Sequence, residues 1–144
     1  MQVKLGVLAD YANVTADGKL NILGIFDRIN VSQVPAVHPQ MHLVLRLEAQ
    51  PSERDRAHKI EIRLHDPDGA TIFDVNGDIV PHGEGMQPVS TNQILTLNNL
   101  QLDKIGSYNF VIFINNDLKS ELPLHVEFVS MPPAVGSTPS QTFH

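Results

Sequence analysis

The chain has 144 residues, 42% of them apolar and 18% charged, and no cysteine, which predicts one globular domain and excludes disulfides, thiolate metal sites and a cysteine nucleophile. Its net charge of −6, from ten Lys and Arg against sixteen Asp and Glu, argues against nucleic acid or an anionic membrane surface as partners. No apolar stretch approaches the ~20 residues of a membrane span, and the first residues lack a signal-peptide pattern, so we expect a cytoplasmic protein.

The first thirty residues or so predict a β-hairpin. Apolar residues alternate along residues 3–11, a period typical of strands. Asp17 and Gly18 supply a tight turn, because Asp-Gly tolerates positive φ, and residues 19–31 run back as the second strand. The Asp and Asn residues of this segment fall mostly at the turn or on alternate outward positions. We therefore interpret the segment as a hairpin with polar residues at its turn and on its outward positions, and not as an active site.

The next two strands are predicted at residues 41–49 and 58–66, separated by an exposed charged loop. In the first strand the inward residues are Met41, Leu43, Leu45 and Leu47. If the two strands pair as a hairpin, Arg46 faces Glu61, an opposite-charge pair that favours this register. The same register places His42 opposite His65.

Further strands are predicted at residues 70–80, 92–102, 106–114 and 118–129, with a type I turn at 66–69. Pro123 lies in the last strand and removes a ladder donor, which suits an edge strand. About eight strands at short spacing predict an all-β fold, an antiparallel β-sandwich formed by a single domain over residues 1–130. Residues 131–144 hold three prolines and no periodicity, which predicts a flexible Pro/Ser-containing tail.

Residues 95–113, LTLNNLQLDKIGSYNFVIF, resemble the E-to-F passage of an immunoglobulin-like sandwich. In that passage Gly-x-Tyr leads into strand F, and the tyrosine hydroxyl bonds back to the backbone of the corner. The resemblance implies this role for Tyr108, with Phe110 at a position where many immunoglobulin domains carry Cys. It concerns the fold alone.

A second resemblance covers most of the chain. The segments DYANVTADGKLNILGIFDRI, HPQMHLVLRLEA, NQILTLNNL and GSYNFVIFI, in that order, resemble a family of small bacterial single-domain proteins of unknown function. The resemblance implies a bacterial origin and a β-sandwich. It implies no catalytic residues.

Seven histidines in an acidic chain suggest a metal site. In the hairpin register above, His42 lies opposite His65 on an outward face, beside Asp66. Two imidazoles and a carboxylate suit Zn²⁺ or Ni²⁺. Histidines on a solvated strand pair also occur without any metal, so this site is the alternative interpretation, and we expect no cofactor.

Carboxylates offer a Ca²⁺ site as a further alternative. Four carboxylates fall close together in the sequence, along one predicted turn and the strand that follows it: Asp66, Asp68, Asp74 and Asp78. Turn chemistry already explains the first two, and the EF-hand loop is absent.

Catalytic motifs are absent: the sequence has no Gly-x-Ser-x-Gly, phosphate-binding glycine loop or His-Glu-x-x-His. His82 and Glu84 offer an acid/base pair in a loop, without a predicted substrate pocket. An enzyme is therefore the third interpretation. Aromatic residues make up 6% of the chain with no Trp, which argues against a sugar-stacking surface.

The feature that favours a function is an excess of apolar residues. Residues 20–29 and 109–114 are apolar on both strand faces, whereas a lone antiparallel sandwich needs one apolar face per strand. The second faces need cover, from loops of the same chain or from another chain. We predict a non-catalytic protein-interaction or structural module that forms a homo-oligomer, with an interface made by Leu23, Ile25, Val111 and Phe113.

Overall fold

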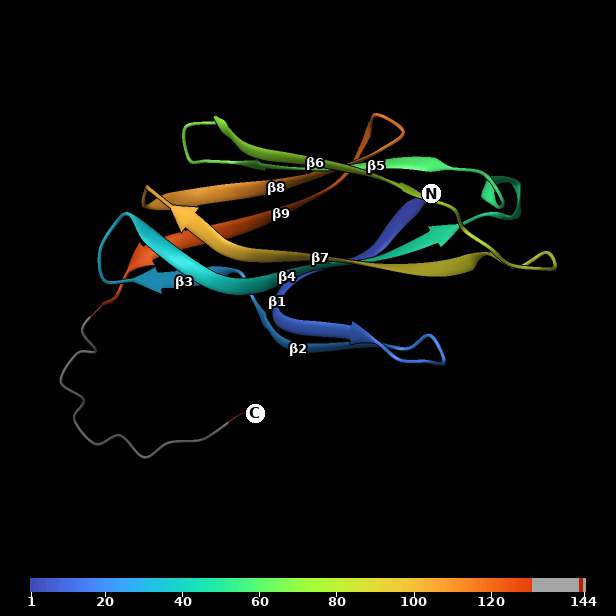
Figure 1. Ribbon diagram of the computed structural model, residues 1–144, viewed down its shortest axis with the longest axis horizontal. Coiled ribbons are helices and arrows are strands. Elements are labelled where there is room, and N and C mark those ends of the chain that lie inside the picture. The colour runs from blue at the N-terminus through green and yellow to red at the C-terminus, as the bar shows by residue number, and fades with distance from the viewer. Residues whose placement is uncertain (131–142, 144) are drawn as a thin grey trace.

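The computed structural model describes residues 1–130 and residue 143 (Figure 1). Over these residues the fold is all-β, as predicted, apart from a 3-10 turn at Pro51–Glu53. The strands are β1 (Gln2–Val14), β2 (Leu20–Phe26), β3 (Arg28–Val31), β4 (Ala36–Ala49), β5 (His58–His65), β6 (Thr71–Ile79), β7 (Val89–Leu102), β8 (Gly106–Ile114) and β9 (Asp117–Phe128). None of the described residues belongs to a helix that is long and apolar enough to cross a membrane. The predicted tail, 131–144, lies outside the described residues except for residue 143.

The strands form two sheets that pack face to face in a sandwich-like arrangement. Sheet A has the order β2-β1-β4-β7, and sheet B has the order β3-β9-β8-β5-β6. Neighbours are antiparallel except β3 and β9, which run parallel, so the prediction of a purely antiparallel sandwich is wrong at this pair. The segment 19–31, predicted as one strand, divides at Asp27 into β2 in sheet A and β3 in sheet B. This division contributes to the nine strands found within residues 1–130, where about eight are predicted.

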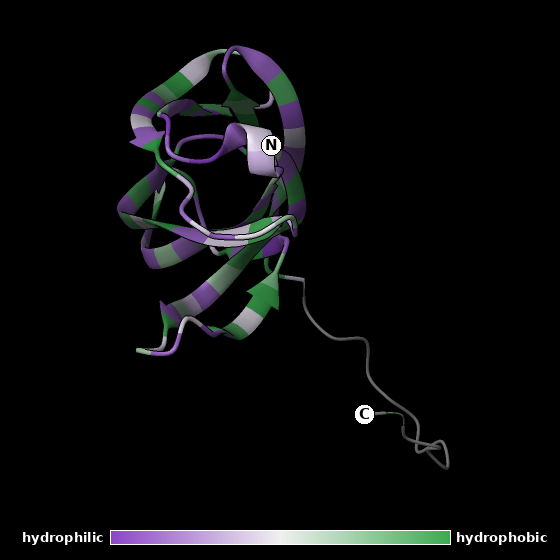
Figure 2. Cartoon of the chain, turned by 90° about the vertical axis from the view of Figure 1, so that its right-hand side faces the viewer, coloured by the Kyte–Doolittle hydropathy of each residue, from purple (hydrophilic) through white to green (hydrophobic). Residues whose placement is uncertain are grey.

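The core lies between the sheets and is built from alternating residues of their central strands. On β4 the inward side chains are fully buried, as predicted: Met41, Leu43, Leu45 and Leu47. They belong to one cluster with Leu64 of β5 and with Phe110 and Ile112 of β8. Figure 2 shows the matching alternation of hydrophobic and hydrophilic bands along the strands. Burying each such side chain contributes about 1.5–3 kcal/mol.

The predicted hairpin between residues 41–49 and 58–66 is wrong. β4 lies between β1 and β7 in sheet A, whereas β5 lies between β6 and β8 in sheet B. Arg46 therefore pairs with residues of sheet A, and Glu61 pairs with Phe113 and Asn76 in sheet B. The alternation specifies which face of each strand is buried, and two strands facing each other across the core satisfy it as well as two strands side by side.

Pro123 lies in β9, which has a neighbour on each side. β3 pairs only with the last part of β9, from His125 to Phe128, so Pro123 is paired with Asn109 of β8 alone. At Pro123 the side of β9 that faces away from β8 has no neighbouring strand. The missing N–H of the proline therefore removes no hydrogen bond between strands.

The predicted tyrosine corner is present between β7 and β8. The hydroxyl of Tyr108 donates to the carbonyl oxygen of Lys104 at 2.9 Å and accepts from the N–H of Lys104 at 3.1 Å. Tyr108 is buried, and its bonds fix the connection that carries the chain from sheet A to sheet B.

Replacing Tyr108 by Phe leaves both backbone groups of Lys104 without this partner, so we expect a loss of about 1–3 kcal/mol in the free energy of unfolding, measured by urea denaturation. Tyr11→Phe is the matched control, because Tyr11 is 49% exposed, and its effect is expected to stay within about 0.5 kcal/mol. Equal effects of the two substitutions contradict the role given to the corner.

Candidate interaction surface

The hairpin of β1 and β2 is bent in its middle. β1 pairs with β4 only as far as Ala9, and from Tyr11 on it pairs with β2 alone. The bend therefore falls near Gly24, which lies between Ile25 and Leu23, the partners of Ala9 and Tyr11. Gly24 has a φ of 70°, and a Cβ at this position would lie 2.6 Å from Oδ2 of Asp10. Both the backbone conformation and the close carboxylate therefore require glycine here.

The bend folds the hairpin back over the outer face of sheet A. Leu5, Arg46 and Asn92 lie side by side on β1, β4 and β7. Because β1 runs from Leu5 away from this position, a straight hairpin would place its turn far from Asn92. Instead, Nδ2 of Asn92 donates to the carbonyl oxygen of Gly18, in the hairpin turn, at 3.4 Å. In Figure 1 the second half of β1 runs back, beside β2, beneath β4 and β7.

This hairpin covers outward residues of β4. His42 and Val44 point away from the core, yet they are only 5% and 0% exposed. Nδ1 of His42 lies 3.2 Å from the carbonyl oxygen of Asp10, which can only accept, so this nitrogen carries the proton. The ring of Tyr11 meets the His42 ring edge-on, with 5.4 Å between centroids. His42 is therefore held as a packing group beneath the hairpin.

The opposite side of the hairpin faces solvent and is apolar. Ala12 is buried and Ile22 half-buried, which shows that their side of the hairpin is turned toward the sheet. On the other side Leu23 is 69% and Ile25 63% exposed, and Tyr11, which pairs with Leu23, is 49% exposed because only part of its ring packs against His42. We call these three residues the hairpin face. Two of them, Leu23 and Ile25, belong to the predicted interface.

The other two predicted interface residues lie on a different sheet and are covered. Val111 and Phe113 point outward from β8 in sheet B, where Val111 is only 6% exposed and Phe113 is half-buried. The guanidinium carbon of Arg63 lies 4.9 Å from the centre of the Phe113 ring. Arg63 is held there by Glu61 at 3.0 Å and by Asp74 at 3.3 Å. The expectation that all four residues share one exposed surface is therefore wrong.

The predicted metal ligands are not assembled. His42 lies beneath the hairpin in sheet A, whereas His65 and Asp66 lie at the end of β5 in sheet B. The register that placed the two histidines opposite each other depended on pairing β4 with β5, which does not occur. Within the described part of the chain, no group of three or more His, Asp or Glu side chains is placed to hold a metal ion.

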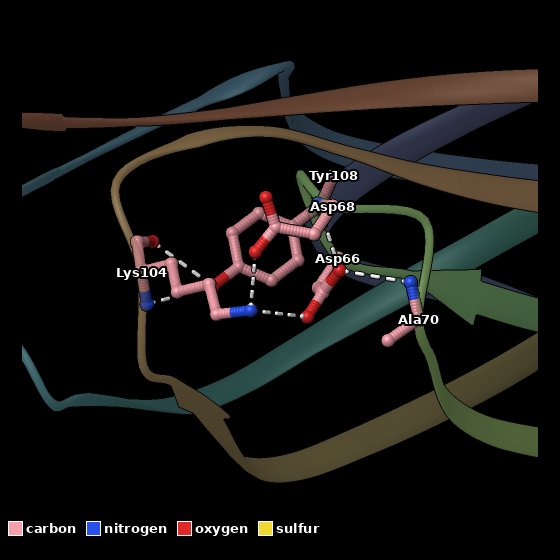
Figure 3. Close-up of polar contacts among 5 residues, drawn as sticks. All are labelled: Asp66, Asp68, Ala70, Lys104 and Tyr108. Atoms are coloured by element: carbon pink, nitrogen blue, oxygen red, sulfur yellow. Dashed lines mark hydrogen bonds and ion pairs between the residues drawn. The ribbon is translucent and has the colours of Figure 1, made fainter.

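Asp66 instead forms an ionic cluster with a lysine from the tyrosine corner (Figure 3). Nζ of Lys104 lies 3.0 Å from Asp66 and 2.6 Å from Asp68. Oδ1 of Asp66 also accepts from the N–H groups of Asp68 and Ala70, both at 2.9 Å, which closes the predicted turn. The ammonium group already occupies the space between the two carboxylates. The cluster therefore joins the β7–β8 connection to the turn at 66–69 and does not form a Ca²⁺ site.

The charges in this cluster shift one another's protonation. The ammonium of Lys104 holds the pKa of Asp66 below its usual range, and the two backbone N–H groups act in the same direction. In turn, the carboxylates of Asp68 and Asp66 raise the pKa of Lys104. Asp66 and Lys104 are thus both ionised from mildly acidic to alkaline pH.

Groups with catalytic potential lie on open surfaces. His82 is 3.2 Å from Asp55 and not bonded to Glu84, and its side chain is 75% exposed. Oγ of the exposed Ser107 lies 2.9 Å from Nδ1 of the half-buried His125, a contact that the sequence did not indicate. Neither pair is enclosed, so neither provides the water-excluded site that proton transfer in catalysis favours.

Two features of the site were missed from the sequence. The fold-back of the hairpin was signalled by Gly24 alone, a glycine inside an otherwise regular strand pattern. The partnership of Lys104 with the 66–69 turn had no signal, because 38 residues separate Lys104 from Asp66.

Replacing Lys104 by Met should raise the pKa of Asp66 toward its ordinary value of 3.8. In the parent, the folded-state pKa of Asp66 is the lower one, so its stabilising contribution is complete above the unfolded-state value and is lost as the pH falls through the folded value. The variant should therefore lose less stability between about pH 5 and about pH 1. Carboxyl-carbon NMR titration gives the pKa directly. Lys119→Met, at an exposed position of β9, is the control, and equal Asp66 pKa values in both variants contradict the assignment.

A family model matches residues 4–127, a span that reaches from β1 to β9 and takes in both sheets. No curated protein matches the chain. The match covers most of the 144 residues, and it confirms the prediction of a family without an assigned function. The chain therefore belongs to the family of unknown function DUF6941.

Proposed function

We propose that this protein is a non-catalytic interaction module that associates with copies of itself through the hairpin face. The observation that carries the proposal is the exposure of Leu23 and Ile25 beside Tyr11, on the solvent side of a hairpin whose other side already covers sheet A. Contiguous exposed apolar side chains of this kind mark interaction surfaces.

The composition of the hairpin supports this proposal. A hairpin that only covers a sheet needs apolar residues on its inner side, because its outer side meets water. Near the turn the outer side is polar, and Nδ2 of Asn21 donates to Oδ1 of Asn13 at 3.0 Å. Past this pair, toward the bend, the outer side becomes apolar at Leu23 and Ile25. The change from polar to apolar along one side favours a bounded contact surface.

We also propose that the sandwich is immunoglobulin-like. The tyrosine corner between β7 and β8 supports it, as does the strand order. The neighbours β1-β4-β7 correspond to strands A, B and E, and β9-β8-β5-β6 correspond to G, F, C and C′ of a variable-type domain. A bacterial origin and a cytoplasmic location complete the proposal, supported by the sequence resemblance and by the absence of cysteine.

Introducing two charges into the hairpin face, Leu23→Lys with Ile25→Lys, should lower the mass of the parent assembly, because a buried contact cannot hold unpaired ammonium groups. Light scattering after size exclusion measures this mass against the 15.9 kDa chain. Unfolding by heat shows whether the variant keeps its fold.

The control adds the same charge elsewhere, through Leu118→Lys with Val129→Lys, at exposed apolar residues outside the hairpin. We expect the control to retain the parent mass. A parent that is a single copy at every concentration, or equal masses for the two double variants, refutes the role of the hairpin face.

A further inference from the structure

β7 is the long free edge of sheet A. It has 14 residues and pairs on one side with β4, in a single register from Val89 to Leu102. On the other side it has no neighbour among the described residues. Its backbone N–H and C=O groups on that side form a row that another strand can pair with.

Over residues 89–98 this edge lacks the features that usually protect edge strands, and the irregular backbone at Asn99, with a φ of 53°, lies beyond them. Its sequence, VSTNQILTLNNLQL, contains neither a charged residue nor a proline. The remaining edges are protected: β6 carries Asp74 and Asp78, β2 is bent at Gly24, and β3 has four residues. β7 is therefore the edge that is open to pairing.

A crevice between β7 and β6 opens into the core along the same side of the sandwich. It has a volume of about 160 Å³, and its walls include Leu45 of β4, Ile62 of β5, Val75 of β6 and Leu95 of β7. Val75 is 38% exposed, and Leu95 is half-buried. The core is thus left incomplete at this edge, with space for an aliphatic side chain.

Gly77 lies at the crevice, within β6 and opposite Ile60. A Cβ at this position would meet nothing closer than Cγ2 of Ile60 at 3.8 Å, so the fold of the single chain leaves room for a side chain. A glycine within a strand costs stability, and such a residue often marks the close approach of another backbone.

We propose that the free edge of β7 pairs with β7 of a second copy, in an antiparallel ladder whose inward side chains fill the crevice of each partner. This inference rests on the proposed self-association and adds a second contact to it. In a two-fold arrangement each strand meets itself, so Leu95 and Leu97 of each copy reach the crevice of the other.

The charge distribution favours a second copy as the occupant. Each chain carries a net charge of −6, so two copies repel each other, and a contact between them is least opposed at a surface that brings no further like charges together. β7 provides such a surface along its whole length. An isologous ladder also requires that no residue be repelled by its own equivalent, which a strand without charges satisfies.

Thr96→Lys tests the ladder, because Thr96 is an exposed residue in the middle of β7. Like charges on both copies should weaken the association by about tenfold or more, measured by sedimentation equilibrium. Thr96→Asp should do the same alone, and an equimolar mixture of the two variants should recover association. Ser32→Lys, at an exposed position between β3 and β4, is the control and should retain the parent value. If the two Thr96 variants associate as the parent does, the inference is overturned.

Gly77→Val provides an independent test of the crevice. The side chain has room within one chain, so thermal stability should be kept or raised, while the association should weaken because the approach of the second backbone is blocked. Unchanged association in this variant contradicts the filling of the crevice.

Hydrogen exchange on the unaltered protein covers the case in which a variant fails to fold. Amide protection within residues 92–98 should rise with protein concentration, and protection that is independent of concentration overturns the ladder. The experiments distinguish the hairpin-face contact from the β7 ladder. A mass that falls for Leu23→Lys with Ile25→Lys but not for Thr96→Lys removes this inference alone, and the reverse result removes the hairpin face alone.

Discussion

Burial of β4 on both of its faces is the constraint that organises this fold. Its inward side chains form the centre of the core, and its outward His42 and Val44 are shielded from water as well. An antiparallel sheet commonly leaves one face to solvent. Here the chain supplies a partial third layer by folding the β1–β2 hairpin over sheet A, and the contacts of His42 with Asp10 and Tyr11 hold that layer in place.

Both sheets carry apolar side chains on their outer faces, and different groups shield these side chains from water. On sheet B, long charged side chains lie over the apolar residues of β8, with Arg63 above Phe113 and anchored by Glu61 and Asp74. Arginine suits this role because its stem and planar head cover apolar surface while its charge stays hydrated. On sheet A the cover is a hairpin, which has two sides. Its inner side packs on the sheet, and its outer side leaves Leu23 and Ile25 exposed to water.

The two open sides of the sandwich also differ. On one side β1 approaches β9 closely, and a Cβ on Gly6 would lie 3.3 Å from Cδ2 of Leu122. The parallel strand β3 extends sheet B further on this side. On the other side, β7 and β6 leave a crevice into the core. The proposed self-association rests on two separate regions, the hairpin face and this crevice, and neither is lined by a charged residue.

The sequence by itself determined most of the strands, the turns and the tyrosine corner, because these depend on neighbouring residues, but it did not show the division of 19–31 into β2 and β3. Alternation predicted the buried side chains of β4, Asp17–Gly18 and Asp66–Gly69 predicted turns, and Gly-x-Tyr predicted the hydroxyl contact of Tyr108. Tertiary structure alone decided which sheet each strand joins. Alternation records which face of a strand is buried but not which strand lies beside it, so the predicted pairing of His42 with His65 failed. The fold-back at Gly24 and the tie from Lys104 to Asp66 were likewise decided by contacts between distant segments, whose free energy depends on packing that no local pattern encodes.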